Sequence, residues 1–496
     1  MTEVKNNFVQ KVCEITGEDY ESTKKKMDHT RKVLGILYGE YFNNKFYELT
    51  YTEQKVESRR IIIRRNNRNA RFDKINAATG WSRPEIRQKI KEINDKNIFN
   101  MTLILYAKYE AYRYEGEELD AFLKLMADRL VLKNQLLSKF EQIDKGEAEY
   151  AETADLLKRF YLLVEKIMPE SLVDMWIEEL GPSHPELKDD RTAGIKAAVK
   201  MEVIRVLFPF SAMEYVAFDF HEKSIEEIRE FITDKERMRI LNVINDPSCF
   251  DILDNKIETY SRFKQYYGRE MISVTSESDY GIFEEFCKKN RRIVVKPPCE
   301  TQGRGIRAIC IDEYESEKEV FDMLIDDHGE FMVEELIVAH EAIKKLNPDS
   351  VNTVRMITYF DGEKSIIHNT FMKVGQKGCF IDNGGAGGIL VSIDPVTGRF
   401  DSDGCDERGV RYEKHPYTGT KFMGYQLPDW EKARTLGLEL SDKVPGLRYI
   451  GWDLTYTAEN EWVIVEGNAK TQFVGQQCTK GKGVRKDFIE TVNYKE

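Results

Sequence analysis

Several features that would place this chain in a special class of proteins are missing. No stretch approaches the roughly 18 apolar residues of a membrane span, and the N-terminus, Met1-Thr-Glu-Val-Lys-Asn6, has no apolar signal core. Only 13 of the 496 residues are proline, whereas 41% are hydrophobic. We therefore expect a folded, cytoplasmic protein without a membrane span, and not a disordered or fibrous one.

Paired cysteines and an excess of positive charge are also missing. The eight cysteines show no Cys-x-x-Cys spacing and have no histidine at zinc-finger distance, so we expect them to be reduced and structural. The net charge of −12 argues against a general nucleic-acid binder. One basic cluster is interpreted as a solvated helical face, with a phosphate or partner patch as the alternative. Its members are Arg59, Arg60, Arg64, Arg65, Arg68 and Arg71.

The length of the chain exceeds the size at which a single core keeps growing, so several structural units are expected. Residues 1–170 contain few glycines, and apolar residues recur at helical spacing in segments such as Leu156–Leu162. This pattern predicts a helical N-terminal domain. Strand-like runs dominate after residue 290, which predicts a mixed α and β C-terminal part. These runs are Arg292–Pro297, Phe331–Glu335, Val351–Thr358, Ser365–His368 and Gly388–Ile393.

Two further strand-like runs near the C-terminus carry metal-ligand chemistry. Ile450–Tyr456 and Trp462–Asn468 are separated by a polar break, which predicts a hairpin. Because side chains alternate along a strand, Glu466 and Asn468 share one face, and Asp453 on the neighbouring strand is placed to meet them. Two carboxylates and an amide oxygen are hard ligands that suit Mg²⁺. The alternative is an acidic hairpin that binds no ion.

A candidate phosphate-binding segment lies upstream. Lys296 ends an apolar strand and precedes a loop that includes Gly303, Arg304 and Gly305. A lysine at a strand end can meet phosphate oxygens, and glycine lets backbone N–H groups approach them. The arrangement differs from a P-loop, because no Gly-x-x-x-x-Gly-Lys-Ser/Thr pattern occurs. The glycine loop alone is weak evidence for a nucleotide site.

The strand that begins at Phe331 continues into a connection whose backbone groups are free to pair with an adenine edge. This connection comprises Glu334, Glu335, Leu336 and Ile337. Glu341 follows seven residues after Glu334, within reach of ribose hydroxyls. Taken singly, each glutamate is better explained as an ordinary surface charge.

In chain order, these segments resemble the signature of the ATP-grasp superfamily. The resemblance is carried by Lys256, Lys296, the loop Glu300–Gly305, Glu334–Ile337 and the Asp453, Glu466 and Asn468 set. Four further segments resemble the sugar-transfer-associated ATP-grasp family. They are Ser350–Arg355, Ile381–Gly388, His415–Gly419 and Gly451–Asp453. The resemblance covers roughly residues 205 to 490 and leaves the first 170 residues unexplained.

The resemblance implies a role for each matching residue. Lys256 and Lys296 would hold the ATP phosphates, Glu334–Ile337 would line the adenine pocket, and Glu341 would meet the ribose. Asp453, Glu466 and Asn468 would bind two Mg²⁺ ions, for which Mn²⁺ would substitute. Arg355 would neutralise the transferring phosphoryl group, with Lys373 and Asn383 nearby. The sequence departs from the family pattern twice, because Gln302 replaces an expected glycine and Lys373 an expected arginine.

The implied fold is an α+β/α-β mixed ATP-grasp fold, in which two α+β lobes clamp ATP, preceded by a mainly helical domain. We expect the helical domain, of unknown role, at 1–170 and a pre-ATP-grasp region and linker at 171–290. The small lobe is expected at 291–340 and the large lobe with its Mg²⁺ site at 341–496.

Three functions follow, in order of preference. The first is an ATP-dependent ligase that joins a carboxylate to an amine or related nucleophile through an acyl phosphate, on a sugar or cell-surface precursor, and forms ADP and phosphate. The second is a kinase that phosphorylates a small molecule with the same residues. The third is a nucleotide-binding module without catalysis. No Ser-His-Asp or Cys-His pattern requires another chemistry.

Overall fold

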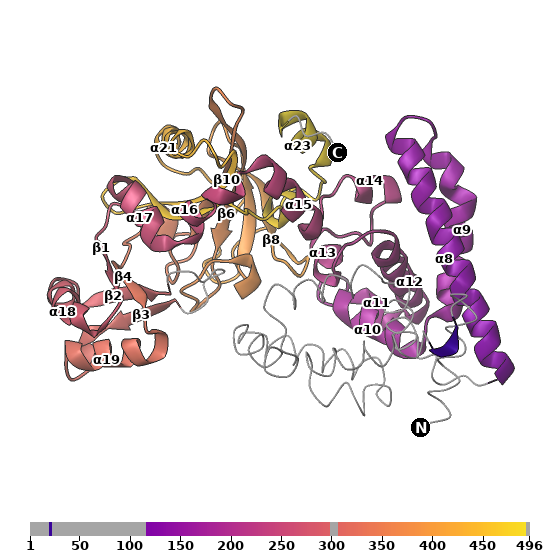
Figure 1. The fold of residues 1–496 in the computed structure, drawn as a ribbon, viewed down its shortest axis with the longest axis horizontal. Coiled ribbons are helices and arrows are strands. Elements are labelled where there is room, and N and C mark those ends of the chain that lie inside the picture. The colour runs from indigo at the N-terminus through magenta and orange to yellow at the C-terminus, as the bar shows by residue number, and fades with distance from the viewer. Residues whose placement is uncertain (1–18, 22–115, 298–305, 493–496) are drawn as a thin grey trace. The chain divides into compact units, whose positions relative to one another are not determined.

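The computed structural model describes residues 19–21, 116–297 and 306–492 (Figure 1). The chain divides into two compact units, Met1–Phe208 and Pro209–Glu496. The first unit contains helices beyond residue 170, where we expected the helical domain to end. The predicted boundaries at 290 and 340 fall inside the second unit and stay proposals. The basic cluster at Arg59–Arg71 lies outside the described residues.

The described part of the first unit is helical, as the apolar spacing predicted. Helix α8 packs against α9, and α10 packs against α12. Leu136, Phe160 and Trp176 are among the fully buried side chains of this unit. Helix α12 begins where the Asp190 carboxylate accepts hydrogen bonds from the next backbone N–H groups. The helices are α8 (Gly116–Asp144), α9 (Ala154–Ile167), α10 (Glu170–Leu180), α11 (Glu186–Asp189) and α12 (Arg191–Leu207).

The second unit begins with short helices that lead to its first sheet. Two of these helices, α16 and α17, are followed by a 3-10 turn at Lys264–Tyr266, and Gly268 comes next with a φ of +58°. A left-handed backbone at this position favours glycine. The helices are α13 (Ala212–Ala217), α14 (Ile225–Arg229), α15 (Asp234–Ile244), α16 (Asp251–Asp254) and α17 (Lys256–Phe263).

A four-stranded antiparallel sheet with the order β1-β4-β2-β3 comes next. Helices α18 and α19 lie beside it (Figure 1) and share one core with its strands. Val295, Phe321 and Val333 are fully buried in that core. The elements are β1 (Met271–Val274), α18 (Tyr280–Lys289), β2 (Arg292–Lys296), β3 (Arg307–Cys310), α19 (Glu317–His328) and β4 (Phe331–Glu335).

The larger sheet has seven strands in the order β11-β10-β5-β6-β7-β8-β9, and every neighbouring pair is antiparallel. Helix α21 packs against β5 and β6. Trp452, Met356 and Leu440 are fully buried in the core. The strands are β5 (Thr353–Phe360), β6 (Ser365–Val374), β7 (Ile389–Ile393), β8 (Phe400–Cys405), β9 (Arg411–Tyr412), β10 (Tyr449–Tyr456) and β11 (Trp462–Asn468).

The remaining helices of the second unit are α20 (Glu341–Lys344), α21 (Trp430–Asp442), α22 (Val474–Cys478) and α23 (Arg485–Val492). The short helix α22 packs against β6 and β7. The cysteines in the described ranges are free thiols, as expected, and Cys405 Sγ lies 3.2 Å from Cys478 Sγ. The two sheets and the helices packed against them confirm the mixed α and β architecture predicted for the C-terminal part.

Candidate functional site

One pocket of the second unit is lined by residues from both sheets. The small sheet contributes residues of β2 and β4, and the large sheet contributes residues of β6, β10 and β11. Helix α17 contributes Lys256, its first residue, which follows the N-cap residue Asn255. The lining brings together eight of the residues singled out from the sequence: Lys256, Lys296, Glu334, Ile337, Lys373, Asn383, Asp453 and Glu466.

The predicted hairpin is formed by β10 and β11. Asp453 pairs with Glu466 in its register, and Gly451 pairs with Asn468. Directly opposed residues of an antiparallel pair project from the same face, so the three polar side chains share one face, as expected. The Asn468 amide nitrogen lies 3.4 Å from Asp453 Oδ2. The structure thus has the predicted strand pairing, and the assignment of these three residues to a metal stays a prediction.

Asp453 is held by two cations, one from the adjacent strand β5 and one from β6, the next strand in the sheet. Arg355 lies opposite Asp453 in the β5–β10 register. Its guanidinium donates from Nε to Oδ1 at 2.6 Å and from Nη2 to Oδ2 at 2.9 Å. Lys373 on β6 adds a third hydrogen bond, from Nζ to Oδ2 at 3.0 Å. Burial would raise the pKa of Asp453, but Arg355 and Lys373 outweigh that effect and lower it.

The donor set fits a hard divalent cation, with one restriction. A carboxylate offers about four lone-pair positions, and Arg355 and Lys373 use three of those on Asp453. The Glu466 carboxylate has no hydrogen bond or ion pair with any residue in the described ranges, and Glu466 lines the pocket. Glu466 is therefore the carboxylate that is open to an ion, and Asp453 would share its charge between the ion and its two cationic neighbours.

Lys373 is surrounded by oxygen atoms. Its ammonium donates to Asn383 Oδ1 at 3.0 Å as well as to Asp453, and Asp382 Oδ1 lies 3.7 Å away. Asp382 in turn accepts hydrogen bonds at 2.7 Å from the backbone N–H and the hydroxyl of Thr353. Sequence reasoning missed Asp382, although it directly precedes Asn383 in the glycine-rich stretch 381–388. Its position beside a polar residue in that stretch was the available signal.

On the small sheet, Lys296 forms an ion pair with Glu334. The register places Val294 opposite Glu334 and Lys296 opposite Met332 on β2 and β4. Arg269, which no sequence motif indicated, contacts Glu334 Oε2 at 2.8 Å. A buried carboxylate with two cationic partners thus stands beside the residue predicted to bind phosphate.

The turn before β5 is built by the Ser350–Arg355 segment. Asn352 has a φ of +52° and is fully buried. Its amide donates to the backbone carbonyls of Asn347 and Ser350, and its carbonyl accepts from the Ser350 hydroxyl and the Gly375 N–H. These bonds fix the start of β5, which positions Thr353 and Arg355. The motif is thus partly structural.

Five of the predicted residues do not line the pocket: Glu335, Leu336, Glu341, Arg355 and Asn468. Glu335 accepts from the Glu270 N–H at 2.9 Å. Glu341 pairs with Lys344 at 2.9 Å, and its side chain is 77% exposed. Arg355 and Asn468 contact Asp453, which does line the pocket. Gly303, Arg304 and Gly305 lie outside the described residues.

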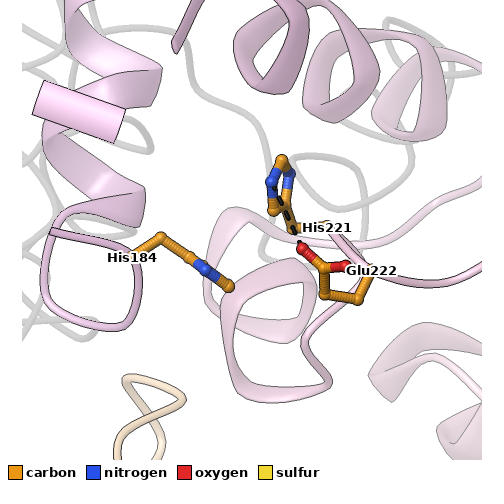
Figure 2. Close-up of side chains that lie close together, drawn as sticks. All are labelled: His184, His221 and Glu222. Carbon is orange, nitrogen blue, oxygen red and sulfur yellow. Dashed lines mark ion pairs between the residues drawn. The ribbon is translucent and has the colours of Figure 1, made fainter. Parts of the chain in front are cut away.

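Two histidines of the second unit, His415 and His221, contact groups close to them in space. His415 is fully buried; its Nε2 lies 3.0 Å from the Gly375 carbonyl, and its Nδ1 accepts from the Thr418 N–H. His221 Nε2 lies 3.6 Å from Glu222 Oε1 (Figure 2). His184, also labelled in Figure 2, belongs to the first unit, where its Nδ1 lies 3.2 Å from Glu186. We assign no site to these histidines.

Within the described residues, no helix combines the length and the apolar character needed to cross a lipid bilayer. None of the curated proteins matches the sequence.

Several solved structures are similar to part of the chain at low identity. The structure of the ATP-grasp ligase PsnB complexed with minimal precursor is 13% identical, with a TM-score of 0.33, and the match covers 52% of this chain and 68% of that one. D-alanyl-alanine synthetase A from Vibrio cholerae is 10% identical, with a TM-score of 0.30 over 49% of this chain and 62% of that one.

For the ADP complex of purK, N5-carboxyaminoimidazole ribonucleotide synthetase, the identity is 10% and the TM-score 0.31, over 50% of this chain and 53% of that one. The chain therefore spans less than two thirds of the latter two proteins.

The sequence profile of one protein family covers most of the second unit. The family is described as sugar-transfer associated ATP-grasp, and the match extends over residues 235–493, more than half of the chain. That range contains both sheets and every residue that lines the pocket. The chain therefore belongs to the sugar-transfer associated ATP-grasp family.

Proposed function

We propose that this protein is an ATP-dependent ligase that joins a carboxylate to an amine or a related nucleophile through an acyl phosphate. The observation that carries the proposal is the single pocket in which Lys256, Lys296 and Lys373 face Asp453 and Glu466. Three ammonium groups suit a polyphosphate, and two carboxylates suit the divalent cation that accompanies it. Family membership supports the same assignment.

The reaction consists of two substitutions. A carboxylate oxygen of the substrate attacks the γ-phosphorus of ATP, and the bond to the β-γ bridging oxygen breaks, which forms the acyl phosphate and ADP. The amine then attacks the acyl carbon, the carbon–oxygen bond breaks, and phosphate leaves with one oxygen of the original carboxylate. The proton released by the amine passes to solvent or phosphate.

The residues of the pocket stabilise charge in this scheme and supply no nucleophile. Lys256 and Lys296 bind the ground-state phosphates, and the backbone groups of the Glu334–Ile337 connection pair with the adenine edge. Lys373 and Asn383 lie where the phosphoryl group is transferred, and Arg355 acts there through Asp453. Asp453, Glu466 and Asn468 would hold Mg²⁺, which would supply neutralisation of phosphate charge. Preorganised charges of this kind lower the barrier electrostatically.

Oxygen transfer tests the proposal against direct phosphorylation of a substrate. A screen of carboxylic acids with amines for ADP and phosphate release, read by mass spectrometry, first identifies a competent pair. The carboxylate is then labelled with ¹⁸O. We expect one labelled oxygen to appear in the released phosphate together with ADP. A stable phosphorylated product without labelled phosphate would instead establish a kinase.

A further inference from the structure

Arg269 connects the two sheets that form the pocket. It lies between α17 and β1, directly after Gly268. Its Nε and Nη2 donate to Glu334 Oε2 at 3.1 and 2.8 Å, which ties it to β4 of the small sheet. Its Nη1 donates to the Ile464 carbonyl at 2.7 Å, which ties it to β11 of the large sheet. Ile464 precedes Glu466 by two residues on that strand.

The contacts of Arg269 are almost completely shielded from water. The side chains of Arg269 and Glu334 are each 4% exposed. The guanidinium also stacks on the Tyr267 ring, 4.9 Å from its centroid, and donates to the Tyr267 carbonyl at 3.0 Å. Screening by solvent is weak at such a position, so the ion pair is retained at ordinary salt concentrations.

Glu334 divides its two oxygens between two cations. Arg269 binds Oε2, and Lys296 binds Oε1. Burial would raise the pKa of Glu334, but Arg269 and Lys296 together lower it, so the carboxylate stays ionised. A phosphate that takes the Lys296 ammonium as its partner must therefore compete with a buried anion.

We propose that Arg269 is a positioning residue for the nucleotide phosphates. It serves as the permanent counter-charge of Glu334, so that Lys296 can move its ammonium to phosphate without leaving a buried carboxylate unpaired. Through Ile464, the same side chain keeps the strand that carries Glu466 attached to the small sheet. This inference rests on the proposed function, because it assumes that Lys296 binds nucleotide phosphates.

The charge balance predicts a specific pattern among variants. In Arg269→Gln, Lys296 is the remaining cation on Glu334, and its transfer to phosphate would strand a buried carboxylate, which is costly. Nucleotide affinity should therefore fall. Removing the negative charge as well, in Arg269→Gln/Glu334→Gln, abolishes that cost and leaves Lys296 available. A purely structural role for Arg269 predicts no such recovery.

The experiment measures the affinity of the full chain for Mg²⁺ and a non-hydrolysable ATP analogue by calorimetry. We expect Arg269→Gln to weaken binding roughly 10- to 100-fold and the double variant to return to within about threefold of wild type. Arg269→Lys keeps the positive charge but loses the planar set of guanidinium donors. Its affinity for the analogue should therefore lie between that of Arg269→Gln and that of the double variant. Arg262→Gln is the matched control, since Arg262 lies on α17 with a side chain 42% exposed.

Thermal unfolding of each variant separates loss of fold from loss of affinity. If Arg269→Gln does not fold, Arg269→Lys and the double variant still test the inference, because it requires both of these variants to bind the analogue. Unchanged affinity in Arg269→Gln, or a double variant as weak as the single one, overturns the inference alone. Absence of binding by the wild-type chain overturns the proposed function and this inference together.

Discussion

Asp453 and Glu466 face each other across β10 and β11, yet the surroundings of their carboxylates differ. Asp453 is 2% exposed and carries three hydrogen bonds from cationic groups. Glu466 is half-buried, lines the pocket and has no ion-pair partner among the residues that the structure describes. The Asp453 carboxylate thus contributes to the stability of the fold, whereas the Glu466 carboxylate is available to a ligand. Substitutions at the two positions should therefore differ in their effect on stability.

We predict that Glu466→Gln abolishes Mg²⁺-dependent turnover while the fold is retained. The substitution preserves volume and breaks no ion pair, but it removes the charge that an ion requires. Turnover of ATP with a competent substrate pair should fall roughly 100-fold or more, and the midpoint of thermal unfolding should stay at the wild-type value. Steady-state kinetics over a range of Mg²⁺ concentrations, together with circular dichroism, measure both quantities.

Glu459→Gln is the control for this prediction, because Glu459 is exposed in the turn between β10 and β11. It should leave turnover unchanged. Near-wild-type turnover in Glu466→Gln would show that the metal assignment is wrong.

Gly451 leaves space for two neighbouring side chains of the second unit. Gly451 on β10 lies below the side chains of Arg355 and Thr471, and a methyl group at this glycine would clash with the Thr471 hydroxyl and come within 2.9 Å of Arg355 Cδ. The Arg355 guanidinium also donates to Thr471 Oγ1 at 3.1 Å. The absence of a side chain at position 451 therefore allows Arg355 to lie flat against Asp453.

We predict that Gly451→Ala lowers the free energy of unfolding by about 1–3 kcal/mol, because overpacking forces Arg355 or Thr471 to move. Gly281→Ala in α18 is the matched control. A methyl group at Gly281 meets nothing within 4 Å, so alanine should stabilise the helix by up to about 1 kcal/mol. Urea unfolding of both variants measures the two changes. Equal effects of the same sign would contradict the packing argument.

The sequence predicted local elements better than it predicted the contacts between them. The runs at Arg292–Pro297 and Phe331–Glu335 coincide with β2 and β4 because apolar β-formers and turn residues mark them. The β10–β11 face followed from strand periodicity alone. In contrast, Arg269 stands in no motif, and its partners Glu334 and Ile464 come from two different sheets. Such long-range contacts depend on the packing of the sheets, which one sequence does not reveal.

At the scale of the whole molecule, buried ionisable groups make stability depend on pH. Glu334 and Asp453 have lowered pKa values, so the stability that they contribute is present above about pH 4.5 and is lost as the pH falls through their folded-state values. His368 makes the stability depend on pH in a higher pH range. Burial lowers the pKa of His368 to about 4, although the Asp487 carboxylate opposes the shift.

The His368 imidazole lies beside two aromatic rings of the second unit. Its Nδ1 lies 2.9 Å from the Tyr449 hydroxyl, and its ring packs against Tyr449 and Phe488. The unfolded chain takes up a proton at this histidine near pH 6.5, whereas the folded chain does so only near pH 4. Between these values the unfolded state binds more protons, so the free energy of unfolding must decrease as the pH falls. The buried His415 acts with the same sign.

We predict that wild-type protein loses about 2 kcal/mol of stability through His368 between pH 7 and pH 4.5 and that His368→Gln reduces this loss. Glutamine keeps a polar partner for the Tyr449 hydroxyl but does not titrate, so the variant should be less stable than wild type at pH 7 and closer to it at pH 4.5. Urea unfolding at both pH values measures the difference. Below about pH 4 the two proteins should unfold in parallel, because the paired carboxylates Glu334 and Asp453 then dominate. An equal loss of stability in both proteins between pH 7 and pH 4.5 would show that His368 titrates normally in the folded state.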